Sequence, residues 1–184
     1  MYEYNRIILP PTLNPGGEPT YLEQIPRKAI WGNFSALFGM ANNERIVITR
    51  EKLGAIIPSE NLVEQFAMAA TARPIEFAPL SADGLYVLRT FNVLAEHVEE
   101  FVELSQNAWT TFETDGEFTA GPQGLFHPNV VRNGLIPMQL VTWYDGLSSW
   151  ERSRAPDENA RDNFARRRLL THSTSAIAAR LAEL

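Results

Sequence analysis

Hydrophobic and polar positions along the first half of the chain predict strands and helices in alternation. The loose alternation across residues 2–9 is typical of a half-buried strand, and residues 29–38 and 44–50 predict the two strands of a hairpin. Before the hairpin, Thr20 is placed to cap a short helix. After it, the apolar residues of 61–72 fall on one helical stripe. The expected order is strand, helix, strand, strand, helix.

The second half repeats that order. Residues 85–91 predict a strand, and residues 93–113 predict the longest helix, with an apolar stripe and an acidic opposite face. A turn and an irregular strand follow over 114–128. The strand at 139–144 then leads directly into a short helix, and we expect the carboxylate of Asp145 to cap it.

Residues 155–184 lie outside this repeated pattern. Pro156 and Asp157 open a helix, and acidic residues four positions before arginines support it. The polar run 171–175 is poor helical material, so we expect a break there before a last helical segment. The sequence therefore predicts a C-terminal helical arm.

The two halves predict an internal duplication. Each follows the split β-α-β order called ferredoxin-like, so we place a first repeat at 1–81, a second at 82–154 and the helical arm at 155–184. The fold class is α+β, with tandem ferredoxin-like repeats.

Composition narrows the class of protein. A chain of 184 residues with 45% hydrophobic content is long enough for one compact duplicated domain. A net charge of -6 argues against a nucleic-acid partner, because phosphates require a concentrated basic surface. The absence of cysteine excludes disulfides and thiolate chemistry. We find neither a secretion signal nor an apolar run of roughly 20 residues, so we expect no membrane span and a cytoplasmic location.

Three stretches carry motifs of a known family: "YVLRTFNVLAEHVEEFVEL" at 86–104, "WGNFSALFGMANNERIVITR" at 31–50 and "QLVTWYDGLSSWERSR" at 139–154. They resemble the repeat start, the hairpin and the closing strand-to-helix motif of the NIPSNAP family. The resemblance implies a dimeric α/β-barrel-type structure, with sheets forming a barrel and helices outside it. Closure within one chain and closure between two chains both stay open. The family has no agreed catalytic residues, so none is transferred.

The spacing of the three histidines does not predict a metal site. His97, His127 and His172 occur singly, without the spacing of a local ligand set, and we expect neither a metal nor a cofactor. His127, before Pro128 in a predicted loop, is the best functional candidate of the three, although a surface role is the more common one for a lone histidine.

Arginine and aromatic residues supply the other candidates. Arg89 lies in the middle of an apolar strand, where a buried guanidinium needs either a salt bridge or an anionic ligand. Trp109, Trp143 and Tyr144 are expected to line a core or a pocket. The arginine run 166–168 is most simply a solvated helix face balanced by nearby acids.

Two functions remain open at this point. The first is a NIPSNAP-like module of undefined activity that binds a small apolar or aromatic ligand, or a partner. The alternative is a cofactor-independent monooxygenase or isomerase acting on a small aromatic or enolisable substrate, in which Arg89, His127 and Tyr144 converge. We also expect a homodimer, because the arm keeps apolar residues that a free tail would not, namely Phe164, Leu169, Leu170, Ile177 and Leu181.

Overall fold

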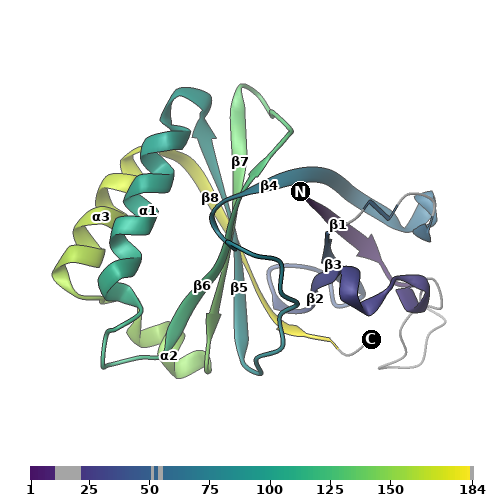
Figure 1. Cartoon of the computed structure of the whole chain (residues 1–184), viewed down its shortest axis with the longest axis horizontal. Coiled ribbons are helices and arrows are strands. Elements are labelled where there is room, and N and C mark those ends of the chain that lie inside the picture. Colours follow the sequence, from purple (N-terminus) through teal and green to yellow (C-terminus); the bar gives the residue numbers. More distant parts are fainter. Residues whose placement is uncertain (11–21, 51, 54–55, 183–184) are drawn as a thin grey trace.

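Eight antiparallel strands form a closed barrel in the computed structural model (Figure 1). The structure describes residues 1–10, 22–50, 52–53 and 56–182. The strands are β1 (Tyr2–Ile8), β2 (Ile30–Phe38), β3 (Glu44–Thr49), β4 (Leu62–Arg73), β5 (Leu85–Leu94), β6 (Ala120–Pro128), β7 (Leu135–Tyr144) and β8 (Thr171–Leu181). The helices are α1 (Val98–Phe112), α2 (Leu147–Arg152) and α3 (Glu158–Leu169), with 3-10 turns η1 (Leu22–Gln24), η2 (Arg27–Ala29), η4 (Ser59–Asn61) and η5 (Ala95–His97).

The barrel closes within one chain. Its strand order is β1-β3-β2-β8-β5-β7-β6-β4, so the first four strands are neighbours in the order β4-β1-β3-β2 and the last four in the order β8-β5-β7-β6. Both sets have the order of a ferredoxin-like sheet, and the pairs β2–β8 and β4–β6 join them. This confirms the α+β barrel class. The exact repeat boundaries stay a prediction.

Aromatic side chains fill the inside of the barrel. The rings of Tyr2, Trp31 and Phe126 contact one another, with centroids 5.0–6.1 Å apart, and Phe34 and Tyr86 pack edge to face beside them. All five side chains are buried. The interior is therefore a packed core, and a larger ligand must be held outside the strands.

Helices cover the outer face of only one half of the barrel. In Figure 1, α1, α2 and α3 lie beside the strands β5 to β8, while the described residues on the side of β1, β2 and β3 form no long helix. Along β5 the side chains alternate, so that Leu88 faces the barrel core and Val87 lies in the outer cluster with Ala108 and Phe112 of α1. A second hydrophobic layer, separate from the barrel core, thus lies between the sheet and the helices.

The segment predicted as a helix over 61–72 is the strand β4. Its Phe66 and Met68 belong to the barrel core, two positions apart as on a strand. Its apolar residues had been placed on a helical stripe, but pairing with both β1 and β6 closes the barrel and outweighs the helical propensity of its alanines.

The C-terminal arm is a helix followed by a barrel strand. The helix α3 is as predicted, but residues 171–181 form β8, which pairs with β2 and β5. The apolar residues that suggested a dimer interface mostly pack within the chain: Phe164, Leu170, Ile177 and Leu181 join its clusters, and only Leu169 is largely exposed, at 87%. A homodimer stays a prediction that this arm no longer supports.

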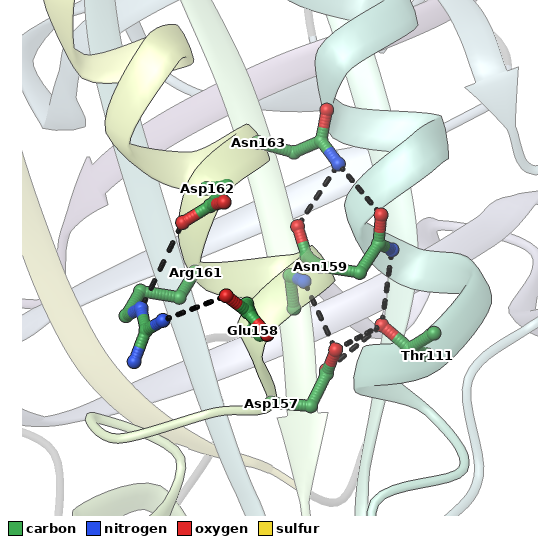
Figure 2. A network of polar contacts seen from close by, with 8 residues as sticks. Thr111, Asp157, Glu158, Asn159, Arg161, Asp162 and Asn163 are labelled. Atoms are coloured by element: carbon green, nitrogen blue, oxygen red, sulfur yellow. Dashed lines mark hydrogen bonds and ion pairs between the residues drawn. The ribbon is translucent and has the colours of Figure 1, made fainter.

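The predicted cap at Asp145 is wrong. Gly146 is the N-cap residue of α2, without a side-chain hydrogen bond, and Asp145 is exposed. Asp157 is the capping residue instead: its carboxylate accepts from Ala160 N at the start of α3 and from Thr111 Oγ1 of α1 (Figure 2). The expected cap at Thr20 lies outside the described residues.

The described helices are too short or too polar to reach across a lipid bilayer.

Candidate functional site

A cavity of about 710 Å³ lies between the barrel and its helices. The sheet side is formed by β5 and β7 and the helix side by α1 and α3. The link between α2 and α3 and the start of β8, which lie at opposite ends of α3, complete the wall. Aromatic and arginine side chains dominate its wall, including Arg89, Phe91, Trp109, Phe112, Tyr144, Phe164 and Arg167.

Strand alternation turns Arg89 and Tyr144 toward this cavity. On β5, Leu85, Val87 and Phe91 all lie in the outer clusters, and Arg89 shares their parity. In the antiparallel register, Arg89 is opposite Leu140, and Tyr144 follows Leu140 by four residues on β7. Both side chains therefore leave the outer face of the sheet, at different heights along the cavity.

Arg167 is the most unusual side chain of the site. It is only 8% exposed, yet it carries a guanidinium. Its Nη1 donates to Ser105 Oγ at 3.0 Å, and its Cζ lies 4.8, 5.4 and 4.7 Å from the ring centroids of Phe91, Phe101 and Phe164. Among the described residues, no carboxylate forms an ion pair with it.

The electrostatics around Arg167 favour an incoming negative charge. Burial lowers the pKa of the Arg167 guanidinium, the positive charge of Arg89 lowers it further, and Tyr144 acts in the opposite direction. A buried cation without a counter-ion is costly, whereas an anion that reached both guanidiniums would relieve that cost. The arrangement can therefore bind an anion and hold it against aromatic rings.

The rest of the cavity wall has the same sign of charge. Together with Arg89 and Arg167, its lining has five arginines, and no aspartate or glutamate. The whole protein nevertheless has a net charge of -6. No carboxylate lines the cavity directly, and the nearest to its arginines, Glu158 and Asp162, lie beside the exposed Arg161, so positive potential is concentrated inside the cavity.

The structure brings together some of the predicted site residues. Arg89, Trp109 and Tyr144 line the cavity, whereas Trp143 and His127 are not among its lining residues. Trp143 packs against the barrel core, and its Nε1 donates to Asp83 O at 2.9 Å. His127 lies on β6, opposite Ala69 of β4. The expected convergence of Arg89, His127 and Tyr144 is therefore not observed.

Sequence reasoning missed Arg167. The arginine run was expected to be a solvated face, and Arg166 fits this, since its Nη2 lies 3.7 Å from Glu100 Oε1. Arg167 does not, because Ala160, Phe164 and Arg167 follow the three-to-four-residue spacing of one helix face. That spacing was visible in the sequence, and it places one arginine of the run on the buried stripe.

A smaller cavity of about 240 Å³ lies at one end of the barrel, lined by Trp31, Tyr86, Gln123 and residues of the segment 74–82. The Tyr86 hydroxyl donates to Ala82 O at 2.8 Å. Burial, helped by Asp83, raises the pKa of Tyr86 to about 12. The segment packs on the barrel end, and the larger cavity is the better candidate site.

Across the described part of the chain, no three or more histidine, aspartate or glutamate residues are grouped so that they could hold a metal ion.

Comparisons with known proteins support the fold. No protein-family model and no curated protein matches the sequence. A presumed monooxygenase from Lactobacillus acidophilus NCFM has a similar structure, with a TM-score of 0.59 and 11% identity over 99% of this chain and 94% of that one. An anthrone oxidase-like protein has a TM-score of 0.60 and 10% identity over 99% of this chain and 91% of that one.

A third similar structure belongs to a protein whose wider group is known. It is a ferredoxin-fold protein from Listeria monocytogenes 4b F2365 related to antibiotic biosynthesis monooxygenases, with a TM-score of 0.50 and 12% identity over 100% of this chain and 96% of that one. Identities this low establish the architecture alone. The chain has the ferredoxin-like α/β-barrel fold of these monooxygenase-type proteins.

Proposed function

We propose that this protein binds a small aromatic compound in its anionic form, in the cavity between β5, β7, α1 and α3. The observation that carries the proposal is Arg167, a buried guanidinium that lines the same cavity as Arg89, interacts with its positive charge and has no carboxylate partner among the described residues. Proteins seldom bury a cation without compensation, and a ligand anion supplies it.

Ligand shape follows from the wall of the cavity. A volume of about 710 Å³ lies within the range of small-molecule sites, and Phe91, Trp109 and Phe164 make part of its wall aromatic. Aromatic rings can stack on these side chains while a carboxylate or phenolate contacts the guanidiniums. Compounds of two or three fused rings with one acidic group match this description.

The binding proposal is tested by titration calorimetry with 2-naphthoate and the uncharged 2-naphthamide. We expect the carboxylate to bind at least about tenfold more tightly than the amide, since each charge-assisted hydrogen bond contributes more than a neutral one. Arg89→Gln should remove most of that preference. Arg166→Gln is the matched control, because Arg166 is also an arginine, next to Arg167 on α3, but pairs with Glu100 outside the cavity. Equal affinities for the two compounds, or no binding of either, would refute the proposal.

Cofactor-independent oxidation is the reaction that this arrangement supports best. Guanidiniums that stabilise an enolate or phenolate favour loss of the substrate proton, and the resulting enolate can pass electrons to dioxygen. The similarity in fold to an anthrone oxidase-like protein and to a presumed monooxygenase favours this second proposal over simple binding. In this scheme Arg89 and Arg167 hold the enolate oxygen, and Tyr144 lies at the cavity wall.

Anthrone is a suitable probe for the reaction. Loss of a ring proton gives its enolate, which transfers electrons to dioxygen; one oxygen atom ends in the new carbonyl of anthraquinone and the other leaves as water. With a chelator present, oxygen uptake and anthraquinone absorbance should exceed the rate in buffer, and Arg89→Gln should lower both. A rate equal to that of buffer would refute the reaction while leaving the binding proposal intact.

Other expectations stay predictions. They are membership of the NIPSNAP family, an isomerase reaction, a homodimer and a cytoplasmic location. Light scattering at several concentrations tests the homodimer, and a single monomer mass throughout would refute it.

A further inference from the structure

Given the aromatic-anion site proposed above, on which this step rests, we infer that the cavity has a second anion-binding subsite where its wall is exposed to solvent. Its residues are Arg154, before the start of α3, and Arg161 and Arg168, seven residues apart on α3; this set is called the outer subsite below. The ligand class that fits both subsites is a flat aromatic dianion, with acidic groups at its two ends.

The outer subsite lines the same cavity as the inner arginines. Arg161 and Arg168 are seven residues apart on α3, which places them on one face of the helix at a rise of roughly 10 Å. Phe164 and Ala165 lie between them and also line the cavity. Arg154 comes from the link after α2, where its guanidinium lies 6.0 Å from the Trp150 ring centroid.

The arginines of the inner and outer subsites differ in their exposure to solvent. Arg167 is buried, whereas Arg154, Arg161 and Arg168 are exposed. An anionic group at the inner pair would therefore be desolvated, and a second group at the outer subsite would stay in contact with water. Aromatic side chains such as Phe91 and Phe164 line the same cavity and suit a ring system that joins the two groups.

The outer arginines have little neutralisation from the protein. For Arg154 and Arg168, the described part of the chain supplies no ion pair. Arg161 lies 3.8 Å from both Glu158 and Asp162, which is long for an ion pair, and all three side chains are well exposed (Figure 2). Figure 2 also shows Arg161 on the side of α3 away from Thr111, so it does not take part in the contact between α3 and α1.

Affinity for a matched pair of probes tests the outer subsite. Naphthalene-2,6-dicarboxylate carries a second carboxylate at the far end of the same ring system as 2-naphthoate. We expect calorimetry to show about tenfold tighter binding of the dicarboxylate to the unmodified protein, since several exposed ion pairs each contribute a small factor. The difference should shrink as salt is added, because these charges are in water.

Two variants test whether the tighter binding of the dicarboxylate depends on the outer arginines. In the double variant Arg154→Gln, Arg168→Gln, the advantage of the dicarboxylate should fall to about twofold or less, with a smaller loss of 2-naphthoate affinity, since Arg89 and Arg167 are intact. The single variant Arg166→Gln should keep the full advantage. Equal binding of the two probes by the unmodified protein, or an unchanged advantage in the double variant, would overturn the outer subsite alone. If 2-naphthoate itself does not bind, the aromatic-anion site fails, and the outer subsite fails with it.

Discussion

Arg167 of α3 donates a hydrogen bond to Ser105 of α1, with 3.0 Å between Nη1 and Oγ. Ser105 Oγ in turn donates to Phe101 O at 2.8 Å, one turn earlier in α1. This contact fixes one edge of the guanidinium against the helix pair and leaves its other donors for a ligand. The buried charge is thus oriented before any ligand binds.

Replacing Arg167 by methionine should separate binding from stability. Arg167→Met removes a charge that no described carboxylate pairs with, so the relief of its burial cost offsets the lost contacts with three aromatic rings. We expect the free energy of unfolding in urea to stay within about 1 kcal/mol or to rise. Affinity for 2-naphthoate should fall by at least about tenfold.

Arg166→Met serves as the control for that variant and should change neither quantity much. A loss of more than about 3 kcal/mol in Arg167→Met would show that the guanidinium is mainly structural, as for one partner of a buried pair.

Asp157 and Asp145 make a matched pair for testing the helix caps. Asp157→Ala loses the cap of α3 and the bonds from Thr111, so we expect a loss of about 2 kcal/mol in the free energy of unfolding. Asp145→Ala should change it by less than about 0.5 kcal/mol, because no cap depends on that exposed side chain. Chemical denaturation of both variants is the measurement. The reverse order of the two losses would contradict the assignment of the caps.

The pH dependence of stability should depend on Tyr4. Burial raises the pKa of Tyr4 from 10.0 to about 12. Between these values the folded protein keeps a proton that the unfolded chain has lost, so this stabilisation is complete below pH 10 and is lost as the pH rises toward 12. At pH 11 the loss from Tyr4 is about 1.4 kcal/mol.

Tyr4→Phe isolates this effect. The free energies of unfolding of the two proteins, compared at about pH 8 and about pH 11, should converge or cross as the unmodified protein loses stability faster. Parallel curves would mean that the Tyr4 hydroxyl titrates in the folded state as it does in the unfolded chain.

Removing residues 171–184 should destroy the fold. The strand β8 pairs with both β2 and β5, so its loss opens two strand edges and exposes the barrel core. We expect the shortened chain to aggregate, without cooperative thermal unfolding in circular dichroism. A shortened chain that melts cooperatively would show that β8 is dispensable, as a helical arm at a dimer interface would be.

The hydrophobic periodicity of the sequence predicted secondary structure correctly where one side of a helix or strand faces water. The helix α1 shows this, since its Phe101, Ala108 and Phe112 are buried and its Glu99 and Glu100 are exposed. It failed for β4 and β8, whose alanine-rich sequences are compatible with a helix until barrel closure makes strands of them.

The candidate site was predictable only in part. Arg89 was identified because a guanidinium within an apolar strand is unusual at the level of sequence alone. Arg167 lies in a run of three arginines, and only the packing of α3 on α1 decides which of them is buried. His127 does not line the cavity that contains Arg89, since it lies on β6, opposite β4. No short sequence pattern reveals that these two side chains are apart.

A crystal structure with 6-bromo-2-naphthoate is the most direct test of the central claim. Anomalous scattering from bromine would locate the ring, and the carboxylate would follow from the density. We predict the carboxylate within hydrogen-bond distance of Arg89 and Arg167, and the ring beside Phe91 and Phe164. A bromine signal in the smaller cavity near Trp31 and Tyr86, or an empty cavity beside Arg167 at saturating ligand, would contradict it.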